Sequence, residues 1–398
     1  MKKKFSLWSW LFPLIVLGGM LIGASSVSAA TYDIDTAADT SDSECVTDIS
    51  LRDAIDCAAA NPGADIITAT GVGTITLASG APQFTDTGGL TFNGGGNTTI
   101  DFDDEARSGF GFANTATNVT IVGWTFQDYG EAAIYLDGDS NTIGGPNGAD
   151  RNVFINILTG QGQATGSAIQ VNGTNQTIEN NYIGVQSNGT TKKSTRTGIL
   201  IQGGANSITI KDNVITSGGG CAIDLSAGGQ SFGVTTIQGN NIGVGSDGTT
   251  DLNPFIGICD RSDMTMTGEL IIGGFGVGEG NTISGALTQG ISLTGTYQAG
   301  IQIEGNKIGT NAAGSAALAN TGPGVDLNGV DCSGGTGCII GGTIAGQRNI
   351  ISGNTNQKGI SITGDTAGWT IEGNYIGLDV NGTTALANGA GIYIAGEA

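Results

Sequence analysis

The chain has 398 residues and a formal net charge of −21, with 72 glycines, 6 prolines and no histidine. Glycine at this level, without a three-residue period and with little proline, excludes a collagen and predicts many tight turns. The mean hydropathy of +0.07 excludes a disordered acidic chain. The strong negative charge argues against nucleic acid as a partner, because nucleic acid is itself negatively charged.

The chain begins with a segment typical of an export signal. Three lysines at positions 2–4 precede an apolar run that ends near residue 22, and Val27-Ser28-Ala29 supplies the small residues of a cleavage site. We expect residues 1–29 to be a signal peptide, cleaved after Ala29 or Ala30, and the protein to be secreted or held at the cell surface. The alternative is an uncleaved membrane anchor. Removing the three lysines changes the net charge from −21 to −24, and no later apolar run predicts membrane insertion of the mature chain.

Residues 30–88 differ from the rest of the chain and are predicted to form an N-terminal cap with the first strands. An amphipathic helix is expected around residues 51–60, with Asp48 or Ser50 as its N-cap and the turn Asn61-Pro62-Gly63 at its end. A stack of coils must cover its first strand edges or it will pair with another chain. The helix is suited to that covering role.

Residues 89–398 repeat a short pattern, which is a small residue, an aliphatic residue, any residue and usually a second aliphatic residue. The pattern starts nine times between positions 133 and 391, at intervals of 24 to 35 residues. Each interval holds two further apolar pairs with the two-residue alternation of β-strands, and helical spacing is absent. Three short strands separated by glycine and asparagine turns predict one coil of a solenoid. The predicted fold is therefore all-β, a right-handed parallel β-helix of roughly 10–11 coils behind a short capping helix.

Asparagine recurs where two strands of a coil meet, at Asn181, Asn241, Asn306 and Asn374. Asparagine tolerates the left-handed backbone conformation and forms hydrogen-bonded stacks with its own kind. These four residues are predicted to be structural corner residues.

Every second coil carries an insertion, at residues 185–197, 244–256, 310–323 and 378–390. The four loops leave the same corner, so they should form a ridge with a spacing of roughly 10 Å, twice the strand spacing. Polar loops on a rigid scaffold are frequent binding sites, although tolerated surface excursions are the simpler alternative. The charged residues of the first two insertions are the binding candidates: Lys192, Lys193, Arg196, Asp247 and Asp251.

The N-terminal segment CVTDISLRDAIDCAAANPGADII resembles the CSLREA domain, a module that precedes bacterial surface β-helices, through SLRDAI and AANPGADII. Where that domain has CSLREA this chain has ISLRDA, and the cysteine comes earlier, at Cys45. The downstream repeats resemble the right-handed parallel β-helices of the pectin-lyase-like superfamily. Together the two resemblances cover nearly the whole mature chain. They imply the fold without selecting a function, because this fold hosts lyases, hydrolases, epimerases and adhesins.

Polysaccharide cleavage on this fold would need acidic residues close together on one outward face. Hydrolysis requires two carboxylates roughly 5–10 Å apart, and the weak catalytic candidates are Asp224, Asp260 and Asp326. Asp224 and Asp326 share the outward position of the repeat but lie three coils apart, about 14 Å at strand spacing. Asp260 takes an inward position. The resemblance also implies, for a lyase, a carboxylate cluster that binds Ca²⁺ beside an Arg or Lys, and no such set is evident.

The cysteines of an exported chain can form disulfides. Two pairs lie close in sequence and are disulfide candidates: Cys45 with Cys57, and Cys332 with Cys338. Cys221 and Cys259 lie on adjacent coils with an offset of three residues, about 10 Å along an extended strand. A disulfide needs Cα atoms within about 7 Å, so we predict that these two stay unpaired.

No cofactor is expected, since without histidine or a CxxC spacing no zinc site is predicted. Acidic runs at 101–105 and 137–139 could hold Ca²⁺, or could be solvated turns. We expect a secreted or cell-surface scaffold that binds a polysaccharide or another surface ligand through its loop ridge. The alternative is a polysaccharide lyase or glycoside hydrolase with its site on an outward face of the coils. Because the chain stops just after the strand expected at 391–394, we expect a C-terminal continuation, or covering by a partner or by self-association.

Overall fold

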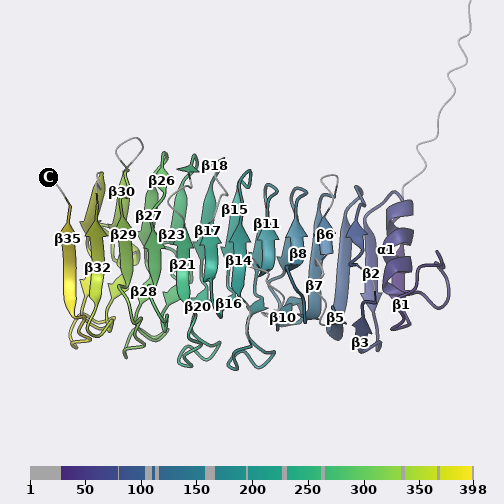
Figure 1. Cartoon of the computed structure of the whole chain (residues 1–398), viewed down its shortest axis with the longest axis horizontal. Coiled ribbons are helices and arrows are strands. Elements are labelled where there is room, and N and C mark those ends of the chain that lie inside the picture. Colours follow the sequence, from purple (N-terminus) through teal and green to yellow (C-terminus); the bar gives the residue numbers. More distant parts are fainter. Residues whose placement is uncertain are drawn as a thin grey trace, which may run out of the picture.

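The computed structural model describes residues 28–396 apart from 79, 104–109, 113–115, 157–165, 194–195, 226–230, 261–264, 333–336 and 365–367. The predicted signal peptide therefore lies almost wholly outside the described residues. The described chain forms one elongated stack of coils, with helix α1 (Leu51–Ala60) at one end and strand β35 (Ala390–Ala395) at the other (Figure 1). No helix among the described residues is long and apolar enough to cross a membrane.

The coils pair along three parallel sheets. The 11-stranded sheet contains β4 (Gln83–Phe84), β6 (Phe110–Phe112), β8 (Ala132–Leu136), β11 (Ser167–Val171), β14 (Thr197–Ile201), β17 (Cys221–Leu225), β21 (Ile256–Asp260), β25 (Ile291–Leu293), β29 (Val325–Asn328), β32 (Lys358–Thr363) and β35. A 3-stranded sheet contains β18 (Ser231–Phe232), β22 (Thr265–Met266) and β26 (Thr296–Tyr297).

The 21-stranded sheet consists of two parallel ladders that share β5 and β7. One ladder runs β1 (Thr31–Ile34), β2 (Asp65–Ala69), β5 (Leu90–Asp101), β7 (Val119–Gln127), β9 (Thr142–Gly144), β12 (Thr177–Glu179), β15 (Ile208–Lys211), β19 (Thr235–Gln238), β23 (Leu270–Gly273), β27 (Ile301–Glu304), β30 (Cys338–Gly341) and β33 (Trp369–Glu372). The other runs β3 (Thr74–Thr76), β5, β7, β10 (Val153–Ile155), β13 (Tyr182–Ile183), β16 (Val214–Ile215), β20 (Asn241–Ile242), β24 (Thr282–Ile283), β28 (Lys307–Ile308), β31 (Ile350–Ile351) and β34 (Tyr375–Ile376). The predicted all-β parallel β-helix is confirmed.

A continuous inner column of isoleucines holds the coils together. Ile178, Ile210, Ile237, Ile272 and Ile303 pair in register from coil to coil, and each side chain is fully buried. Burying one such side chain stabilises the fold by about 1.5–3 kcal/mol. The stability of the molecule is therefore distributed along its axis, since each coil contacts only its neighbours.

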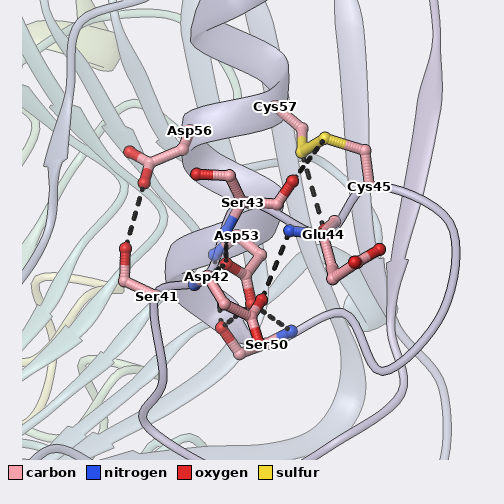
Figure 2. The surroundings of a disulfide bond; sticks show 9 residues. All are labelled: Ser41, Asp42, Ser43, Glu44, Cys45, Ser50, Asp53, Asp56 and Cys57. Carbon is pink, nitrogen blue, oxygen red and sulfur yellow. Dashed lines mark hydrogen bonds between the residues drawn. A yellow bond between two sulfur atoms is a disulfide. The ribbon is translucent and has the colours of Figure 1, made fainter.

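The predicted capping helix has the expected bounds, and Ser50 is its N-cap. The Ser50 hydroxyl accepts from the Asp53 backbone N–H, and the Asp53 carboxylate accepts in return from the Ser50 N–H at 3.2 Å. The same carboxylate also accepts from the backbone N–H groups of Asp42 and Ser43 at 2.9 Å, and the Cys45–Cys57 disulfide joins this loop to the helix (Figure 2). These hydrogen bonds outweigh burial and lower the pKa of Asp53.

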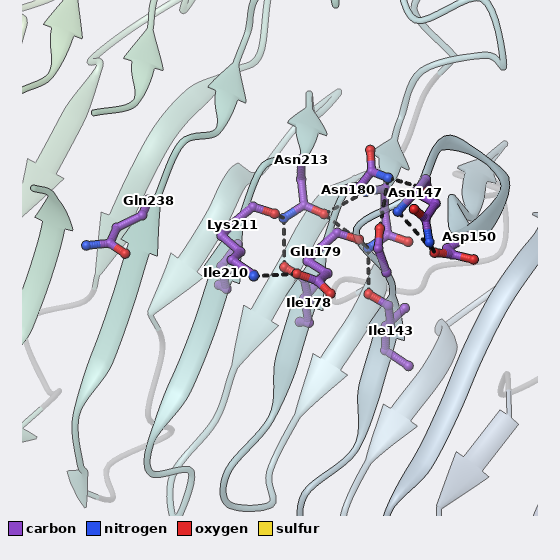
Figure 3. A network of polar contacts seen from close by, with 12 residues as sticks. Ile143, Asn147, Asp150, Ile178, Glu179, Asn180, Ile210, Lys211, Asn213 and Gln238 are labelled. Carbon is purple, nitrogen blue, oxygen red and sulfur yellow. Dashed lines mark hydrogen bonds and ion pairs between the residues drawn. The ribbon is translucent and has the colours of Figure 1, made fainter. Parts of the chain in front are cut away.

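An asparagine ladder turns the chain at one corner of the coils. Each member before the last, Asn374, donates both its backbone N–H and its Nδ2–H to the Oδ1 of the next ladder asparagine, at 2.8–3.3 Å. The same Nδ2 donates to inner-strand carbonyls, as from Asn213 to Ile178 at 2.9 Å (Figure 3). The ladder in the described residues comprises Asn152, Asn181, Asn213, Asn240, Asn281, Asn306, Asn349 and Asn374.

The prediction that Asn241 is a corner residue is wrong by one position in the chain. The other three predicted residues, Asn181, Asn306 and Asn374, do belong to the ladder. In the coils with an N-x-I-G motif, the ladder asparagine stands three residues before the glycine, and in this coil that residue is Asn240. Asn241 is half-buried, and its side chain donates to the Gly245 carbonyl at 3.2 Å. In five of the eight ladder positions the left-handed backbone conformation is adopted by the residue before the asparagine, as at Asn180 with φ of 56°.

Candidate binding groove and hairpin ridge

The four predicted insertions form four similar hairpins at the same corner of the coils. Each hairpin is closed by an antiparallel bridge: Val185 with Lys192, Val244 with Asp251, Thr310 with Ala317, and Leu378 with Ala385. Their sequences VQSNGTTK, VGSDGTTD, TNAAGSAA and LDVNGTTA share a glycine at the fifth position. We call the four hairpins, residues 185–192, 244–251, 310–317 and 378–385, the hairpin ridge.

The hairpins are bonded directly to one another. The backbone N–H of Ser246 donates to the carbonyl of Gly189 at 2.8 Å, and Ala312 donates to Gly248 in the same way at 2.9 Å. Val380 repeats the contact with the third hairpin at 2.9 Å. The shared glycine has φ near +70° and touches the next hairpin, so that a Cβ on Gly248 would lie 2.8 Å from the Cβ of Ala312. The ridge is therefore one hydrogen-bonded band rather than four separate loops.

The acidic residues of the ridge serve its own turns. The Oδ1 of Asp247 accepts from the backbone N–H groups of Thr249 and Thr250, at 2.9 and 2.8 Å, and Asn188 makes the equivalent bonds in the first hairpin. Together with the Thr250 hydroxyl, these donors lower the pKa of Asp247 to about 2. Asp247, a predicted binding residue, is thus engaged within its own turn.

The lysine and aspartate at the base of the ridge join its first two hairpins. Lys192 donates from Nζ to the carbonyl of Asn253, and Asp251 accepts from the backbone N–H of Asn253 at 2.9 Å. Burial lowers the pKa of Lys192 and raises that of Asp251, while the opposite charge of each residue counteracts the shift of the other. Lys193 is half-buried. These three predicted binding residues are not positioned around a common cavity.

Arg196, by contrast, lies in a groove on the outward face of β14, β17, β21 and β25, lined also by residues that precede these strands. The groove has a volume of about 240 Å³. Its lining combines one guanidinium group, two carboxylates, one phenyl ring and two hydroxyl groups with apolar and small residues: Arg196, Thr197, Leu200, Gly219, Gly220, Cys221, Asp224, Phe255, Ile256, Cys259, Asp260 and Ser292. We call this cavity the ridge groove. Phe255 was not among the sequence candidates, although its place at the end of the second insertion marks it.

The floor of the ridge groove contains a disulfide between Cys221 and Cys259, so the prediction that these cysteines stay unpaired is wrong. Their Cα atoms are 5.9 Å apart. The distance between the two Cα atoms is shorter than an offset of three extended residues implies, because the strand bends at the small residue of the repeat. Ala222 and Ile223 are adjacent and both fully buried, which breaks the alternation of an extended strand. A Cβ at Gly257, the matching residue one coil on, would lie 2.3 Å from a carbonyl oxygen.

The structure does not bring the three catalytic candidates together as a set. Asp224 and Asp326 are separated by Cys259 and Ser292 in register, as their spacing predicted. Asp326 is half-buried and accepts from Gln289 at 3.4 Å. Asp224 is 5% exposed in the floor of the ridge groove.

Asp260 borders the same groove but has a structural role. Its carboxylate accepts from the Thr294 backbone N–H at 2.5 Å and hydroxyl at 3.0 Å, from the Gly295 N–H at 2.9 Å and from the Tyr297 hydroxyl at 2.5 Å. Burial raises the pKa of Asp260 against these four donors. A carboxylate that is saturated in this way holds the turn before β26 and is a poor proton donor or nucleophile.

The described residues contain one group of three side chains that could ligate a metal, namely Cys221, Asp224 and Cys259, whose ligand atoms lie within 4.8 Å of one another. The two sulfurs are joined in the disulfide and therefore offer no thiolate. Of the possible Ca²⁺ runs, 101–105 extends beyond the described residues. In 137–139, the Asp139 carboxylate accepts from the backbone N–H and hydroxyl of Thr174.

No family model matches this sequence, and no curated protein matches it. Two solved structures are similar to it. The crystal structure of pectate lyase Pel9A has a TM-score of 0.41 and 14% identity, over 90% of this chain and 82% of that one. A double mutant of the tailspike protein of E. coli bacteriophage HK620 has a TM-score of 0.32 and 16% identity, over 86% and 73% of the two chains. At these values neither name gives information on the activity of this chain.

Proposed function

We propose that the protein is exported, remains at the cell surface or in the medium, and binds a glycan in the ridge groove. The observation that carries this proposal is the composition of that groove. An aromatic ring, Phe255, is 39% exposed beside the guanidinium of Arg196 and the carboxylate of Asp224. A concave apolar wall with a few polar groups is the usual form of a small-molecule or sugar-unit site.

The paired strands support the proposal because they make one wall of the groove rigid. Leu200, Asp224 and Cys259 lie in register on three neighbouring strands, and the Cys221–Cys259 disulfide joins two of these strands. A preorganised wall loses little conformational entropy when a ligand binds. The resemblance of residues 45–67 to the CSLREA domain belongs to the same proposal, since that module precedes surface β-helices.

A polysaccharide lyase is the second candidate, because Arg196 and Asp224 line one groove and could act as base and electrostatic partner. A hydrolase is less suited to this groove, since its second carboxylate, Asp260, accepts hydrogen bonds from the turn before β26. Binding without cleavage needs neither a catalytic pair of carboxylates nor a metal, and it is the function that we propose.

A glycan array and a polysaccharide-degradation screen, run with the same purified mature protein, test both functions. We expect retention of at least one glycan class without new chain ends. Phe255→Ala should weaken that binding about tenfold, which corresponds to about 1.4 kcal/mol. Phe275→Ala is the matched control, because Phe275 is 65% exposed and does not line the ridge groove. Equal effects of the two substitutions would refute the ridge groove as the site, and unsaturated chain ends would establish the lyase.

A further inference from the structure

The residue just before the first strand of the stack donates its backbone N–H to a buried carboxylate. The backbone N–H of Ala30 donates to Oδ1 of Asp65 at 2.7 Å, and its carbonyl accepts from the Ile66 N–H at 2.9 Å. Strand β1 then continues in register with β2, with Thr31 opposite Ile66. Ala30 is therefore the first residue fixed on both sides by the fold.

The carboxylate that binds Ala30 belongs to an acidic pair that is short of donors. Asp65 and Asp86 are 1% and 4% exposed, and the Oδ2 atom of each is buried without a hydrogen-bond partner among the described residues. Oδ1 of Asp65 accepts a second bond from Asn61 Nδ2 at 2.8 Å, and Oδ1 of Asp86 accepts from the Gly88 N–H at 2.7 Å. Neither carboxylate forms an ion pair with a described side chain.

The electrostatics of this pocket favour an added positive charge. Burial, and then the charge of Asp65, raise the pKa of Asp86, and the same two causes raise the pKa of the Tyr32 hydroxyl. Burying a charged carboxylate costs free energy unless an opposite charge or hydrogen-bond donors compensate it. A cation at Ala30 would therefore relieve both acids.

Cleavage of the predicted export signal would place such a cation there. Ala30 follows Val27-Ser28-Ala29, which has the small residues of a signal-peptidase site. Hydrolysis of the Ala29–Ala30 bond adds one water, leaving a carboxylate on Ala29 and an ammonium group on Ala30. That ammonium carries three N–H donors where the uncleaved amide carries one, and it is charged at neutral pH.

We propose that signal cleavage after Ala29 creates an α-ammonium group that binds the buried Asp65 carboxylate, beside Asp86, and so locks the N-terminal cap in the exported protein. The bond that positions the nitrogen already exists at 2.7 Å. Cleavage after Ala30 would remove the rung formed with Ile66, so the structure favours the earlier of the two predicted sites. The inference rests on the predicted export and is independent of glycan binding.

The test is selective acylation of the α-amine of the secreted protein near pH 8, with its N-terminus defined by intact mass and sequencing. We expect Ala30 as the first residue, and an α-amine that is acylated about tenfold or more slowly in the folded protein than in urea. This follows because an upward pKa shift of about 1.4 units from the usual α-amine value of about 7.8 lowers the free amine fraction at pH 8 about tenfold. Asp65→Asn should abolish the protection, whereas Asp35→Asn, a change at an exposed position of the same cap, should leave it intact.

A second form keeps the test informative if Asp65→Asn does not fold. Protein that retains Ala29 at its N-terminus keeps every side chain from Ala30 onward but displaces the ammonium by one residue, and its α-amine should be acylated at the unfolded rate. The proposal is overturned if the mature chain begins at another residue, or if Ala30 is acylated equally fast in the folded and unfolded protein. If the protection of the Ala30 α-amine against acylation disappears with EDTA, Asp65 and Asp86 would be assigned to a metal ion, and the proposal would be overturned as well.

Discussion

Replacing Asn240 by alanine should destabilise the stack far more than the same change at Asn241, although the two residues are adjacent in the chain. Asn240 is fully buried, and its Nδ2 donates to the carbonyls of Ile210 and Gln238 at 2.9 Å and to the next ladder asparagine at 3.0 Å. Its Oδ1 accepts two bonds from Asn213, both at 3.0 Å.

The magnitude follows from the groups that lose a partner. In Asn240→Ala a backbone N–H and two carbonyls each lose a hydrogen bond at a buried corner. Each unpaired buried group costs about 1–3 kcal/mol, and partial relaxation brings the expected total to about 3–5 kcal/mol. Asn241 is half-buried and makes one bond of 3.2 Å to Gly245, so Asn241→Ala should cost about 0.5–1.5 kcal/mol.

Urea unfolding followed by circular dichroism measures the global effect. Because coils of a solenoid can unfold in groups, amide hydrogen exchange at Asn213 is the local measurement, and its protection should fall by the same free energy. An Asn241→Ala protein that is as unstable as Asn240→Ala, or more so, would refute the ladder register described above.

The other predictions concern one disulfide, one hairpin contact and one turn acid. Alkylation and mass spectrometry should find no free thiol at Cys221 or Cys259, and quantitative alkylation of the native protein would contradict the disulfide. Replacing both cysteines by serine should destabilise the fold by up to about 4 kcal/mol, because the unfolded chain is no longer constrained over a separation of 38 residues. Gly248→Ala should lower the urea midpoint more than Gly71→Ala. Both glycines have φ above +70°, but only a Cβ on Gly248 would contact the neighbouring hairpin. Equal midpoints would exclude hairpin stacking as a source of stability. The NMR titration of Asp247 should give a pKa near 2, so its stabilisation of the hairpin is present above an unfolded pKa of about 3.9 and is lost as the pH falls towards 2. Asp247→Asn should keep the hairpin and remove that acid dependence, as the asparagine of the first hairpin indicates, and an unchanged acid transition would disprove the assignment.

Much of the architecture followed from local patterns. Alternating aliphatic residues at regular intervals predicted strands that cannot bury their apolar side chains alone, and stacking is the arrangement that buries them. The bounds of helix α1 followed from Ser50 and from the turn after Ala60, because capping and termination act within a few residues. The shared corner of the four insertions followed from their constant place in the repeat.

The ladder position can be read from the sequence, whereas the bend in the strand cannot. Asn181, Asn240, Asn306 and Asn374 all stand three residues before the glycine of an N-x-I-G motif, and the prediction of Asn241 misaligned this motif by one residue. The Cys221–Cys259 disulfide depends on a bend at the small residue of the repeat, which shortens a distance that an extended strand would make too long.

The sequence by itself determined that this chain stacks chemically similar coils along one axis, because the repeat period and the aliphatic alternation are properties of the chain alone. Only the tertiary structure decided that Arg196, Asp224 and Phe255 line one groove, since they come from three different coils. It also decided that Asp260 serves a turn and that Ala30 meets Asp65. Contacts between coils depend on register and local curvature, and neither is encoded in the order of residues within a single repeat.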